Sequence, residues 1–345
     1  LGLADRLRDA GIAVCGNSAA ATRIESSKSW ANDLMREAGI PTAASVTVRD
    51  LAAGRRAIAE FGAPVVIKAD GLAAGKGVVV AQSVAEAEAA LRAMLEEHAF
   101  GDAGATVVIE ECLTGRELSV LALSDGTTIV PLQPACDYKR AFANEEGPNT
   151  GGMGAYTPTR AVDDALLATI QRTILEPAMQ AMNERGCPLR GVLYAGLILT
   201  ADGPRVIEFN ARFGDPETQV VLPVLQSDLA ALLHAVATGT LATMPAPVSA
   251  GAAVGVILAA AGYPVRYEKD QPITGLHRVT DEILDFHAGT TRDADGGIVT
   301  AGGRVLTVVG RGDTLAAARD RAYGGIADIT FPGGWYRPDI ALREV

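Results

Sequence analysis

Hydrophobic and polar positions follow two periods along this chain, one typical of amphipathic helices and one typical of strands. We predict helices at 19–38, 50–61, 83–98, 162–185, 217–238 and 313–325. Asp50 is the predicted N-cap of the second of these, and Ser83 with Glu86 forms a predicted capping box at the start of the third. Short apolar runs bounded by turn residues predict strands at 43–48, 64–68, 77–81, 106–112, 117–124, 192–200, 204–209, 252–260 and 303–309. Because hairpins are mixed with crossover helices, the pattern favours a multidomain chain of α/β and α+β architecture over a helical bundle or a solenoid.

The first residues predict a helix followed by a strand. The segment "LADRLRDAG" is amphipathic and ends at Gly11, and the apolar run "IAVCG" after it predicts a buried strand. A helix that leads into a strand is the second half of a βαβ unit. Since the chain opens at Leu1 with this half, we expect a truncated chain or an N-terminal part that was separated from it.

Length and charge narrow the class of protein. A chain of 345 residues is longer than one ordinary domain, so we expect two or three packed units. Hydrophobic residues at 48% and charged residues at 21% describe a globular protein with a full core. The net charge of −11 argues against binding to nucleic acids or membrane surfaces, because both need a basic surface. Segments 239–250 and 137–155 are candidate linkers.

The cysteines and the hydropathy exclude two further classes. Cys15, Cys112, Cys136 and Cys187 are widely spaced, which excludes a structural zinc site of closely spaced ligands. Cys112 and Cys136 lie in or beside apolar runs and are predicted to be buried free thiols of a cytoplasmic protein. No apolar run approaches the roughly 18 residues of a membrane span.

A glycine-rich stretch, "VVIKADGLAAGKGVVVA" at 65–81, suggests phosphate binding. A P-loop places four residues between its first glycine and the Gly-Lys pair, followed by Ser or Thr and a helix. Here three residues separate Gly71 from Gly75-Lys76, Gly77 comes next, and a strand follows. A dinucleotide fingerprint also requires a helix at this point. Two interpretations remain: a hairpin tip that lays backbone N–H groups over a polyphosphate, or an exposed tip with a solvated lysine.

Charged residues also close two neighbouring apolar runs. Lys68 ends "VVIK", where its ammonium either reaches a phosphate or extends into water. The run "VVIEECLTGRE" places Glu110, Leu113 and Glu117 at and after the end of a strand. Such a connector can hold adenine by its backbone and ribose by a carboxylate. The alternative is a strand rim with solvated acids, above all at Glu111.

The stretch "VIEFNARFGDPETQ" at 206–219 carries the strongest set of polar residues. It follows the strand "VLYAGLILT" through the turn "ADG", so the two segments predict a hairpin. Glu208 and Asn210 are two residues apart in a strand and therefore share a face. Carboxylate and amide oxygens are ligands that magnesium takes together with nucleotide phosphates. A solvated Glu208 is the alternative, which the apolar residues around it disfavour.

The residues after that strand predict a second anion-binding group. Arg212 is placed to meet a phosphate. Asp215-Pro216 has two interpretations: a helix N-cap followed by proline at the first helical position, or a catalytic carboxylate. A helix start is also an anion site, so the two are compatible.

The segment 136–156, "CDYKRAFANEEGPNTGGMGAY", is too long and polar for a simple connection. It combines Asp137, Lys139 and Arg140 with a glycine loop formed by Thr150, Gly151, Gly152, Met153 and Gly154. The pattern is typical of a substrate loop, and a disordered surface loop is the alternative.

Together these residues resemble the ATP-grasp superfamily and, within it, the phosphoribosylamine–glycine ligase family. The resemblance rests on "KADGLAAGKGV", "GPNTGGMGAY", "LYAGL" and above all "EFNARFGDPETQ", which is that family's signature. It extends to "HAGT" at 287–290 and "GGRVLTV" at 302–308. The resemblance implies an ATP-grasp fold with a remnant of a Rossmann-like N-terminal domain and a small C-terminal α+β domain. The implied boundaries are 1–45 for the remnant, 46–113 for the ATP-grasp lid, 114–248 for the catalytic subdomain and 249–345 for the C-terminal domain.

The resemblance also implies a role for each candidate residue. ATP would be bound by Lys28, Lys68, Glu110, Leu113 and Glu117 and by a mobile lid that contains Gly71, Gly75, Lys76 and Gly77. Mg²⁺ or Mn²⁺ would be bound by Glu208 and Asn210. Catalysis would use Arg212, Asp215 and Lys139. The other substrates would meet Asp137, Arg140 and the loop Thr150, Gly151, Gly152, Met153 and Gly154.

The implied reaction joins glycine to 5-phosphoribosylamine with ATP, in purine biosynthesis, and releases ADP and phosphate through a glycyl phosphate intermediate. Phosphoryl transfer needs charge neutralisation and alignment, which metal, lysine and arginine provide. Two alternatives remain: another ATP-grasp carboxylate–amine ligase, and a nucleotide-binding fragment without catalysis, because the family's N-terminal domain is incomplete here. We expect a cytoplasmic monomer whose partners are small molecules, without nucleic acid or membrane.

Overall fold

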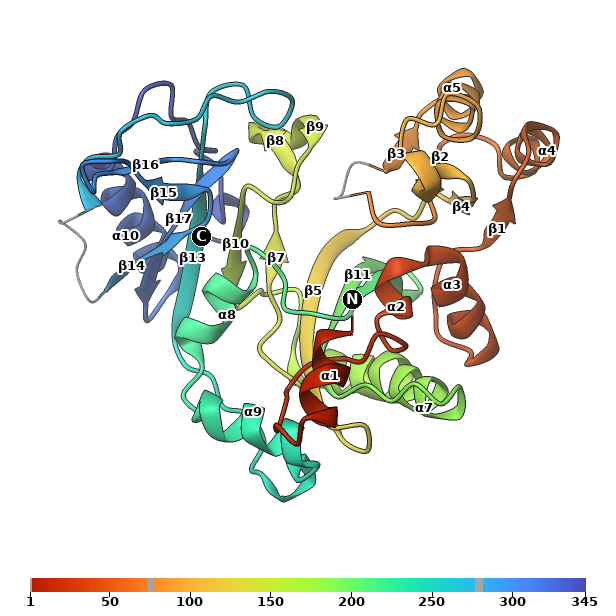
Figure 1. The fold of residues 1–345 in the computed structure, drawn as a ribbon, viewed down its shortest axis with the longest axis horizontal. Helices are drawn as coiled ribbons and strands as arrows, with labels where there is room; N and C mark the ends of the chain where they lie inside the picture. The colour runs from red at the N-terminus through yellow and green to blue at the C-terminus, as the bar shows by residue number, and fades with distance from the viewer. Residues whose placement is uncertain (1, 74–76, 277–281) are drawn as a thin grey trace. The chain divides into compact units, whose positions relative to one another are not determined.

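The computed structural model describes residues 2–73, 77–276 and 282–345, and these form two compact units (Figure 1). The first unit comprises Leu1–Pro131, Asp164–Phe213 and Leu229–Ala246. The second comprises Leu132–Asp163, Gly214–Asp228 and Pro247–Val345. The chain passes from the first unit to the second more than once, and the last passage, between Ala246 and Pro247, lies inside the predicted linker 239–250. The boundaries of the four domains predicted above remain predictions, because a division into two units is coarser than a division into four domains.

One sheet of the first unit has the strand order β1-β4-β2-β3, with every neighbouring pair antiparallel. Its strands are β1 (Ser45–Val48), β2 (Val65–Ala69), β3 (Val78–Ala81) and β4 (Val107–Glu111). The helices α4 (Leu51–Phe61) and α5 (Val84–Leu95) pack against it. Asp50 caps α4, and Ser83 caps α5 by accepting from Glu86 N. Both caps were predicted from the sequence.

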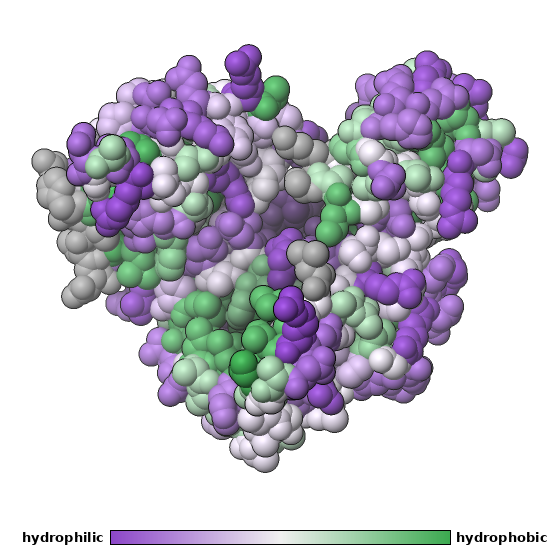
Figure 2. All heavy atoms as spheres, viewed as in Figure 1, coloured by the Kyte–Doolittle hydropathy of each residue, from purple (hydrophilic) through white to green (hydrophobic). Residues whose placement is uncertain are grey.

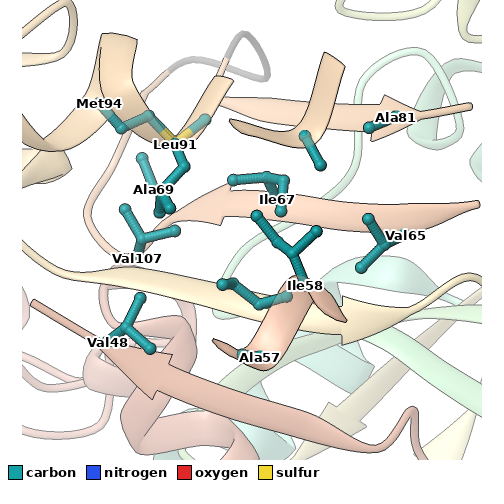
Figure 3. Packing of buried hydrophobic residues seen from close by; sticks show 12 residues of the cluster. Val48, Ala57, Ile58, Val65, Ile67, Ala69, Ala81, Leu91, Met94 and Val107 are labelled. Carbon is teal, nitrogen blue, oxygen red and sulfur yellow. The ribbon is translucent and has the colours of Figure 1, made fainter. Parts of the chain in front are cut away.

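The apolar residues of this β1–β4 sheet lie on the face that α4 and α5 cover. Figure 3 shows Ile67 of β2 and Val107 of β4 directed toward Ile58 of α4 and Leu91 of α5. The two helices approach closely because position 54 is glycine: a Cβ there would lie 2.4 Å from Leu91 Cδ2. The outward surface of α4 and α5, at the upper right of Figure 2, is mainly hydrophilic. The helices are therefore amphipathic, as their sequence period predicts.

The other sheet of the first unit has the order β12-β11-β5-β6 and is also antiparallel. Its strands are β5 (Arg116–Ser124), β6 (Ile129–Pro131), β11 (Gly191–Thr200) and β12 (Gly203–Asn210). Besides α4 and α5, the helices of this unit are α1 (Leu3–Asp9), α2 (Arg23–Ser26), α3 (Lys28–Glu37), α6 (Asp164–Ile170), α7 (Glu176–Glu184) and α9 (Leu229–Thr238). A π-helical segment, Gln171–Leu175, joins α6 to α7. The β11–β12 hairpin was predicted from the sequence.

The second unit is built on a five-stranded sheet of order β14-β17-β13-β10-β7. Its strands are β7 (Cys136–Asp137), β10 (Gly154–Thr157), β13 (Ala252–Ala259), β14 (Ile283–His287) and β17 (Arg304–Gly312). The helices α8 (Thr218–Val224) and α10 (Leu315–Asp328) cover opposite faces. A Cβ at Gly255 would meet Val220 of α8, whereas one at Gly310, on the other face, would meet Ala318 of α10. Two small hairpins, β8 (Arg140–Phe142) with β9 (Glu146–Asn149) and β15 (Thr290–Arg292) with β16 (Ile298–Thr300), complete the unit.

A group of charged and aromatic side chains lies beneath the C-terminal residues of the second unit. The side chain of Arg337 is only 1% exposed. It donates from Nε and Nη2 to Asp339, from Nη2 to Glu145 Oε1 at 3.0 Å and from Nη1 to Arg140 O at 2.9 Å. Its guanidinium also stacks on the ring of Tyr138, 4.7 Å from the centroid. We call Arg337, Asp339, Glu145 and Tyr138 the C-terminal cluster.

Several sequence predictions are wrong. The helix predicted at 19–38 is interrupted at Ser27, which is extended and caps α3 with its hydroxyl. The helix predicted at 217–238 is interrupted after Val224, because Leu225 is extended and Gln226 N donates to Val248 O instead of continuing the helix. The segment 137–155 is not a linker, since it forms β8, β9 and the start of β10.

The start of the chain also differs from the prediction. The segment "IAVCG" is not a buried strand: Ile12 is 51% exposed, and the segment's contact with the second sheet is a hydrogen bond from Gly16 N to Arg190 O. Cys136 is buried as predicted, but Cys112 is only partly buried, and all four cysteines are free thiols. No helix among the described residues is long and apolar enough to cross a bilayer.

Candidate functional site

The face of the β1–β4 sheet opposite α4 and α5 carries a buried ion pair. Val66 of β2 pairs with Glu110 of β4, so Lys68, two residues further along β2, is the diagonal neighbour of Glu110 on the same face. Lys68 Nζ lies 2.6 Å from Glu110 Oε2, and both side chains are less than a tenth exposed. Glu110 Oε1 accepts from Asn32 Nδ2 at 2.9 Å. The carboxylate is therefore held from two sides.

Lys68 also joins this sheet to the second sheet of the unit. Its Nζ donates to Ile207 O at 3.1 Å. In the β11–β12 register Gly196 pairs with Glu208 and Leu197 pairs with Val206, so Ile207 is the extra residue of a bulge. A bulge leaves a residue without a ladder partner. That explains why the carbonyl of Ile207 is open to the lysine.

The start of α3 brings a second ammonium to the same region. Ser29 N donates to Asp70 Oδ1 at 2.6 Å, and Lys28 Nζ donates to Gly71 O at 3.2 Å. Burial lowers the pKa of the Lys28 ammonium, the carboxylate of Glu208 opposes that change, and the neighbouring charge of Lys68 adds to it. We call Lys28, Lys68, Glu110 and Glu208 the nucleotide-side cluster.

The glycine stretch between β2 and β3 forms a hairpin, as predicted. Lys68 pairs with Val78, and Ala69 N donates to Gly77 O at 2.8 Å. Gly71 packs tightly, since a Cβ there would lie 2.7 Å from Ala103 Cβ. Gly75 and Lys76 lie outside the described residues.

The predicted metal ligands lie after the bulge in β12. Glu208 and Asn210 flank Phe209, which is 3% exposed and points to the opposite, apolar face. Asn210 Oδ1 accepts from Arg212 Nη2 at 3.3 Å. Across residues 2–73, 77–276 and 282–345, no three His, Cys, Asp or Glu side chains gather into a metal-binding cluster. A metal here would thus be held by one carboxylate and one amide oxygen, which suits Mg²⁺ or Mn²⁺ with phosphate oxygens as further ligands.

Arg212 is anchored by a residue that the sequence did not indicate. Glu25 of α2 accepts from Arg212 Nε with one carboxylate oxygen and from Ala211 N with the other, each at 2.9 Å. The side chain of Arg212 remains 57% exposed, so it is oriented without being buried. Glu25 stands in the polar stretch "RIESSK", which has no local signal for this contact.

The predicted adenine and ribose residues fall in different environments. Glu110 is 5% exposed and paired with Lys68, as described above. Leu113 is half-buried in the connector between β4 and β5, and Glu117 is exposed in β5 opposite Ile198.

The remaining predicted residues belong to the second unit. Lys139 Nζ lies 3.1 Å from Asp137 Oδ2, and the Asp137 side chain is 5% exposed. Arg140 Nη1 donates to Gly147 O at 2.8 Å, which closes the β8–β9 hairpin. Asp215 is not a helix cap, because α8 begins at Thr218 and Glu217 occupies its N-cap position. The Asp215 carboxylate instead accepts from Gln219 Nε2 at 3.0 Å.

The loop 150–154 is held by both of its flanks. Thr150 Oγ1 donates to Lys139 O at 2.8 Å and accepts from Gly152 N at 3.0 Å. Gly151 N donates to the Tyr263 hydroxyl at 3.1 Å. Met153 is fully buried. The loop is therefore an ordered part of the second unit, and the alternative of a disordered surface loop is wrong. Gly154 begins β10, where a Cβ would lie 2.6 Å from Gly255 O.

Comparison with family models matches both parts of the chain. Residues 26–218 match the model described as phosphoribosylglycinamide synthetase, ATP-grasp (A) domain. Residues 253–343 match the model of the phosphoribosylglycinamide synthetase C domain.

Curated relatives and a solved structure are similar over almost the whole chain. A phosphoribosylamine–glycine ligase from Nostoc sp. is 49% identical over 346 residues, which cover 99% of this chain and 81% of that protein. One from Rhizobium meliloti is 48% identical over 344 residues, covering 100% and 81%. The crystal structure of phosphoribosylamine–glycine ligase from Thermotoga maritima superposes with a TM-score of 0.88 at 36% identity and covers 95% of this chain and 82% of that chain. A biotin carboxylase domain from Hydrogenobacter thermophilus, at 16% identity and a TM-score of 0.75, shares the fold.

Proposed function

Because this chain belongs to the phosphoribosylglycinamide synthetase family, we propose that it is an ATP-dependent ligase that joins glycine to 5-phosphoribosylamine. The products are glycinamide ribonucleotide, ADP and phosphate. The observation that carries this proposal is the nucleotide-side cluster, in which the ammonium of Lys28 interacts electrostatically with the ammonium of Lys68 and the carboxylate of Glu208, all within one unit.

The two lysines of the cluster bind the phosphates of ATP. Lys68 is fixed by Glu110 and by Ile207 O, so its ammonium is oriented before the ligand arrives. Lys28 is at the start of α3, where the helix dipole also favours an anion, while the first backbone N–H groups already donate to Asp70 and Ser27. The lowered pKa of Lys28 agrees with this role, because an incoming phosphate stabilises the charged ammonium that burial disfavours.

Glu208 and Asn210 hold the divalent cation, Mg²⁺ or Mn²⁺. When bound, the cation neutralises charge on the phosphate oxygens during transfer. Arg212, oriented by Glu25, supplies further positive charge on the same side of β12. Glu110 near the end of β4, Leu113 in the connector and Glu117 near the start of β5 hold adenine and ribose by backbone and carboxylate groups.

The β2–β3 hairpin, whose connection contains Gly71 and Gly77, acts as the lid, and the sequence places Gly75 and Lys76 between these two glycines. A lid that closes over ATP excludes water from the reactive acyl phosphate. We place the lid at residues 46–113, between an N-terminal segment at 1–45 and a catalytic subdomain at 114–248, with the C-terminal domain at 249–345.

The second unit holds the other two substrates. Asp137 and Asp215 accept hydrogen bonds from amino groups, while Lys139, Arg140 and the loop 150–154 bind carboxylate and phosphate. In the first step a carboxylate oxygen of glycine attacks the γ-phosphorus, the bond to the β–γ bridging oxygen breaks, and ADP leaves. In the second step the ribosylamine nitrogen attacks the carbonyl of glycyl phosphate, phosphate leaves, and the nitrogen loses a proton.

The test is release of ADP by the whole chain with a divalent cation and ATP. We expect turnover only when glycine and 5-phosphoribosylamine, generated in the assay, are both present. Alanine or bicarbonate in place of glycine tests the nearest alternative, another ATP-grasp carboxylate–amine ligase. Equal turnover with either of them contradicts the proposed specificity. Binding of ATP without turnover under every condition favours a nucleotide-binding role instead.

We further propose that the protein is a cytoplasmic monomer that binds neither nucleic acid nor membranes. The net charge of −11 supports the absence of nucleic-acid and membrane binding, because both surfaces are negatively charged. Light scattering coupled to size exclusion measures the mass in solution, and a mass near twice 35.6 kDa contradicts the monomer.

A further inference from the structure

One arginine of β17 holds together two loops that are far apart in sequence, the loop 150–154 and the turn before α8. Arg304 Nη1 lies 2.7 Å from Gly151 O, 3.2 Å from Asp215 O and 3.4 Å from Gly152 O. Arg304 Nη2 donates to Asp215 Oδ2 at 3.0 Å. All of these residues belong to the second unit.

The contacts use the shape of a guanidinium group. Its two terminal nitrogens point in fixed directions, so one serves the carbonyls while the other serves the carboxylate. A lysine ammonium is a single centre and cannot occupy both places. The Arg304 side chain is 19% exposed, so solvent weakens these bonds less than at a fully exposed pair.

The backbone of Arg304 is itself fixed. Its carbonyl accepts from Gly289 N at 2.9 Å, and the carbonyl of the preceding Gly303 accepts from Ala260 N at 2.8 Å. The guanidinium therefore extends from a strand end whose backbone is held by hydrogen bonds on both sides of the side chain.

Two of the three glycines of the loop fit closely into this arrangement. A Cβ at Gly151 would lie 3.2 Å from Arg304 Cζ. At Gly152 the backbone has φ +108°, and a Cβ would lie 2.5 Å from Pro216 Cδ. The pair "GG" in "NTGGMG" thus lets the loop lie against Arg304 on one side and the Asp215-Pro216 turn on the other.

We propose that Arg304 is a positioning residue that holds the Asp215 carboxylate and the loop 150–154 in the geometry that receives the amino-acid substrate. This inference rests on the proposed function, in which Asp215 and the loop meet the substrates other than ATP. Arg304 acts through those groups. Its loss weakens use of glycine and leaves ATP binding intact, because the nucleotide-side cluster is in the first unit.

The test compares the wild-type chain with Arg304→Ala, Arg304→Lys and, as a matched control, Arg311→Ala. Arg311 is an exposed arginine toward the other end of the same strand. For Arg304→Ala we expect kcat/KM for glycine to fall at least tenfold, which corresponds to about 1.4 kcal/mol. The Kd of a non-hydrolysable ATP analogue should change less than twofold. Arg304→Lys should recover less than half of the lost kcat/KM for glycine. Added guanidinium at millimolar concentration should restore part of the activity of Arg304→Ala. The control Arg311→Ala should match wild type.

A second variant keeps the proposal testable if Arg304→Ala does not fold. In Gly151→Ala the added methyl displaces the guanidinium without removing it, so the same selective loss is expected at smaller size. The proposal is overturned if either folded variant keeps wild-type kcat/KM for glycine, or if ATP affinity falls in parallel. A wild-type chain without glycine-dependent ADP release contradicts the proposed function itself, whereas an active wild type with unaffected variants contradicts only the role of Arg304.

Discussion

The nucleotide-side cluster and the C-terminal cluster both bury basic side chains beside carboxylates, yet they differ in how fully the positive charge is satisfied. Arg337 of the C-terminal cluster donates to two carboxylates and a carbonyl and stacks on an aromatic ring. In the nucleotide-side cluster, Lys68 has one carboxylate and one carbonyl. Lys28 lies beside it with a like charge.

The pKa values of the two clusters move in opposite directions. Burial lowers the pKa of Arg337, but hydrogen bonds and charge from Asp339 and Glu145 outweigh it, so the pKa is raised. For Lys28, burial outweighs the carboxylates of Glu208, Asp70 and Glu110, so the pKa is lowered. Burial and ion pairing therefore do not mark a functional site by themselves. A buried ammonium whose pKa stays lowered despite its neighbouring carboxylates favours an anionic ligand, whereas a buried guanidinium whose partners outweigh its burial stabilises the fold.

The largest effect is expected for Glu208→Gln. The substitution keeps the shape of the side chain and removes the charge that holds the cation, so turnover should fall about a thousandfold, or about 4 kcal/mol. The thermal midpoint should stay close to that of wild type. Asp202→Asn, in the exposed turn of the same hairpin, is the matched control. Near-normal activity of Glu208→Gln would remove Glu208 from the metal site.

The next effect concerns the C-terminal cluster. Arg337→Leu leaves the carboxylates of Asp339 and Glu145 without their partner, so the free energy of unfolding should fall by about 3 kcal/mol. Urea unfolding measures the loss, with Arg311→Leu as the exposed control. The affinity for an ATP analogue, measured where the variant is folded, should be unchanged. A selective loss of ATP affinity would mean that the two clusters do not differ as we infer.

Lys28→Met should weaken ATP binding about tenfold, or about 1.4 kcal/mol, with little effect on stability. The lowered pKa adds a pH dependence: the ammonium is lost at a lower pH than in an ordinary lysine, so wild-type ATP affinity should fall as the pH rises through the alkaline range. Lys28→Arg should keep its affinity to higher pH, because arginine stays charged. Calorimetric titration from pH 7 to pH 10 measures both effects, and identical profiles for wild type and Lys28→Arg would exclude Lys28 as their source.

The smallest effect concerns Asp285, a half-buried carboxylate without a hydrogen-bond partner among the described residues. Asp285 of β14 pairs through its backbone with Val308, and neither carboxylate oxygen has a hydrogen-bond partner among the described residues. Burial raises its pKa to about 6. Since the folded state binds the proton more tightly than the unfolded state, stability should fall as the pH rises from about 4 to about 6 and stay reduced above it.

Asp285→Asn should remove this pH dependence. At pH 7.5 it should raise the free energy of unfolding by about 1 kcal/mol, a modest figure because solvent screens a half-buried group. Below about pH 3 the difference should vanish, because the carboxyl is then mostly protonated in both states. Urea unfolding at the two pH values measures it, and Asp295→Asn is an exposed control. A gain that is the same at both pH values would show that charge is not its cause.

The helix and strand pattern was predictable wherever a local signal existed. Asp50 and Ser83 cap the helices that they were predicted to cap, and the glycine stretch after Lys68 forms a hairpin because strand-forming residues flank it on both sides. The break at Ser27 has a local cause, because its hydroxyl accepts from Trp30 N, whereas another failure came from a contact outside the window of a local pattern. The helix expected through Leu225 ends there because Gln226 bonds to Val248, which the sequence places 22 residues later.

For the candidate site, the sequence by itself determined which residue types would lie at strand ends and loop tips, such as Lys68, Glu208 and the loop 150–154. It determined them because side-chain period and glycine placement act over a few residues. Only the tertiary structure decided that Lys68 meets Glu110, that Glu25 orients Arg212 and that Arg304 joins Gly151 to Asp215. Those partners depend on strand register and on packing between residues 42 to 187 positions apart, and no local pattern carries that information.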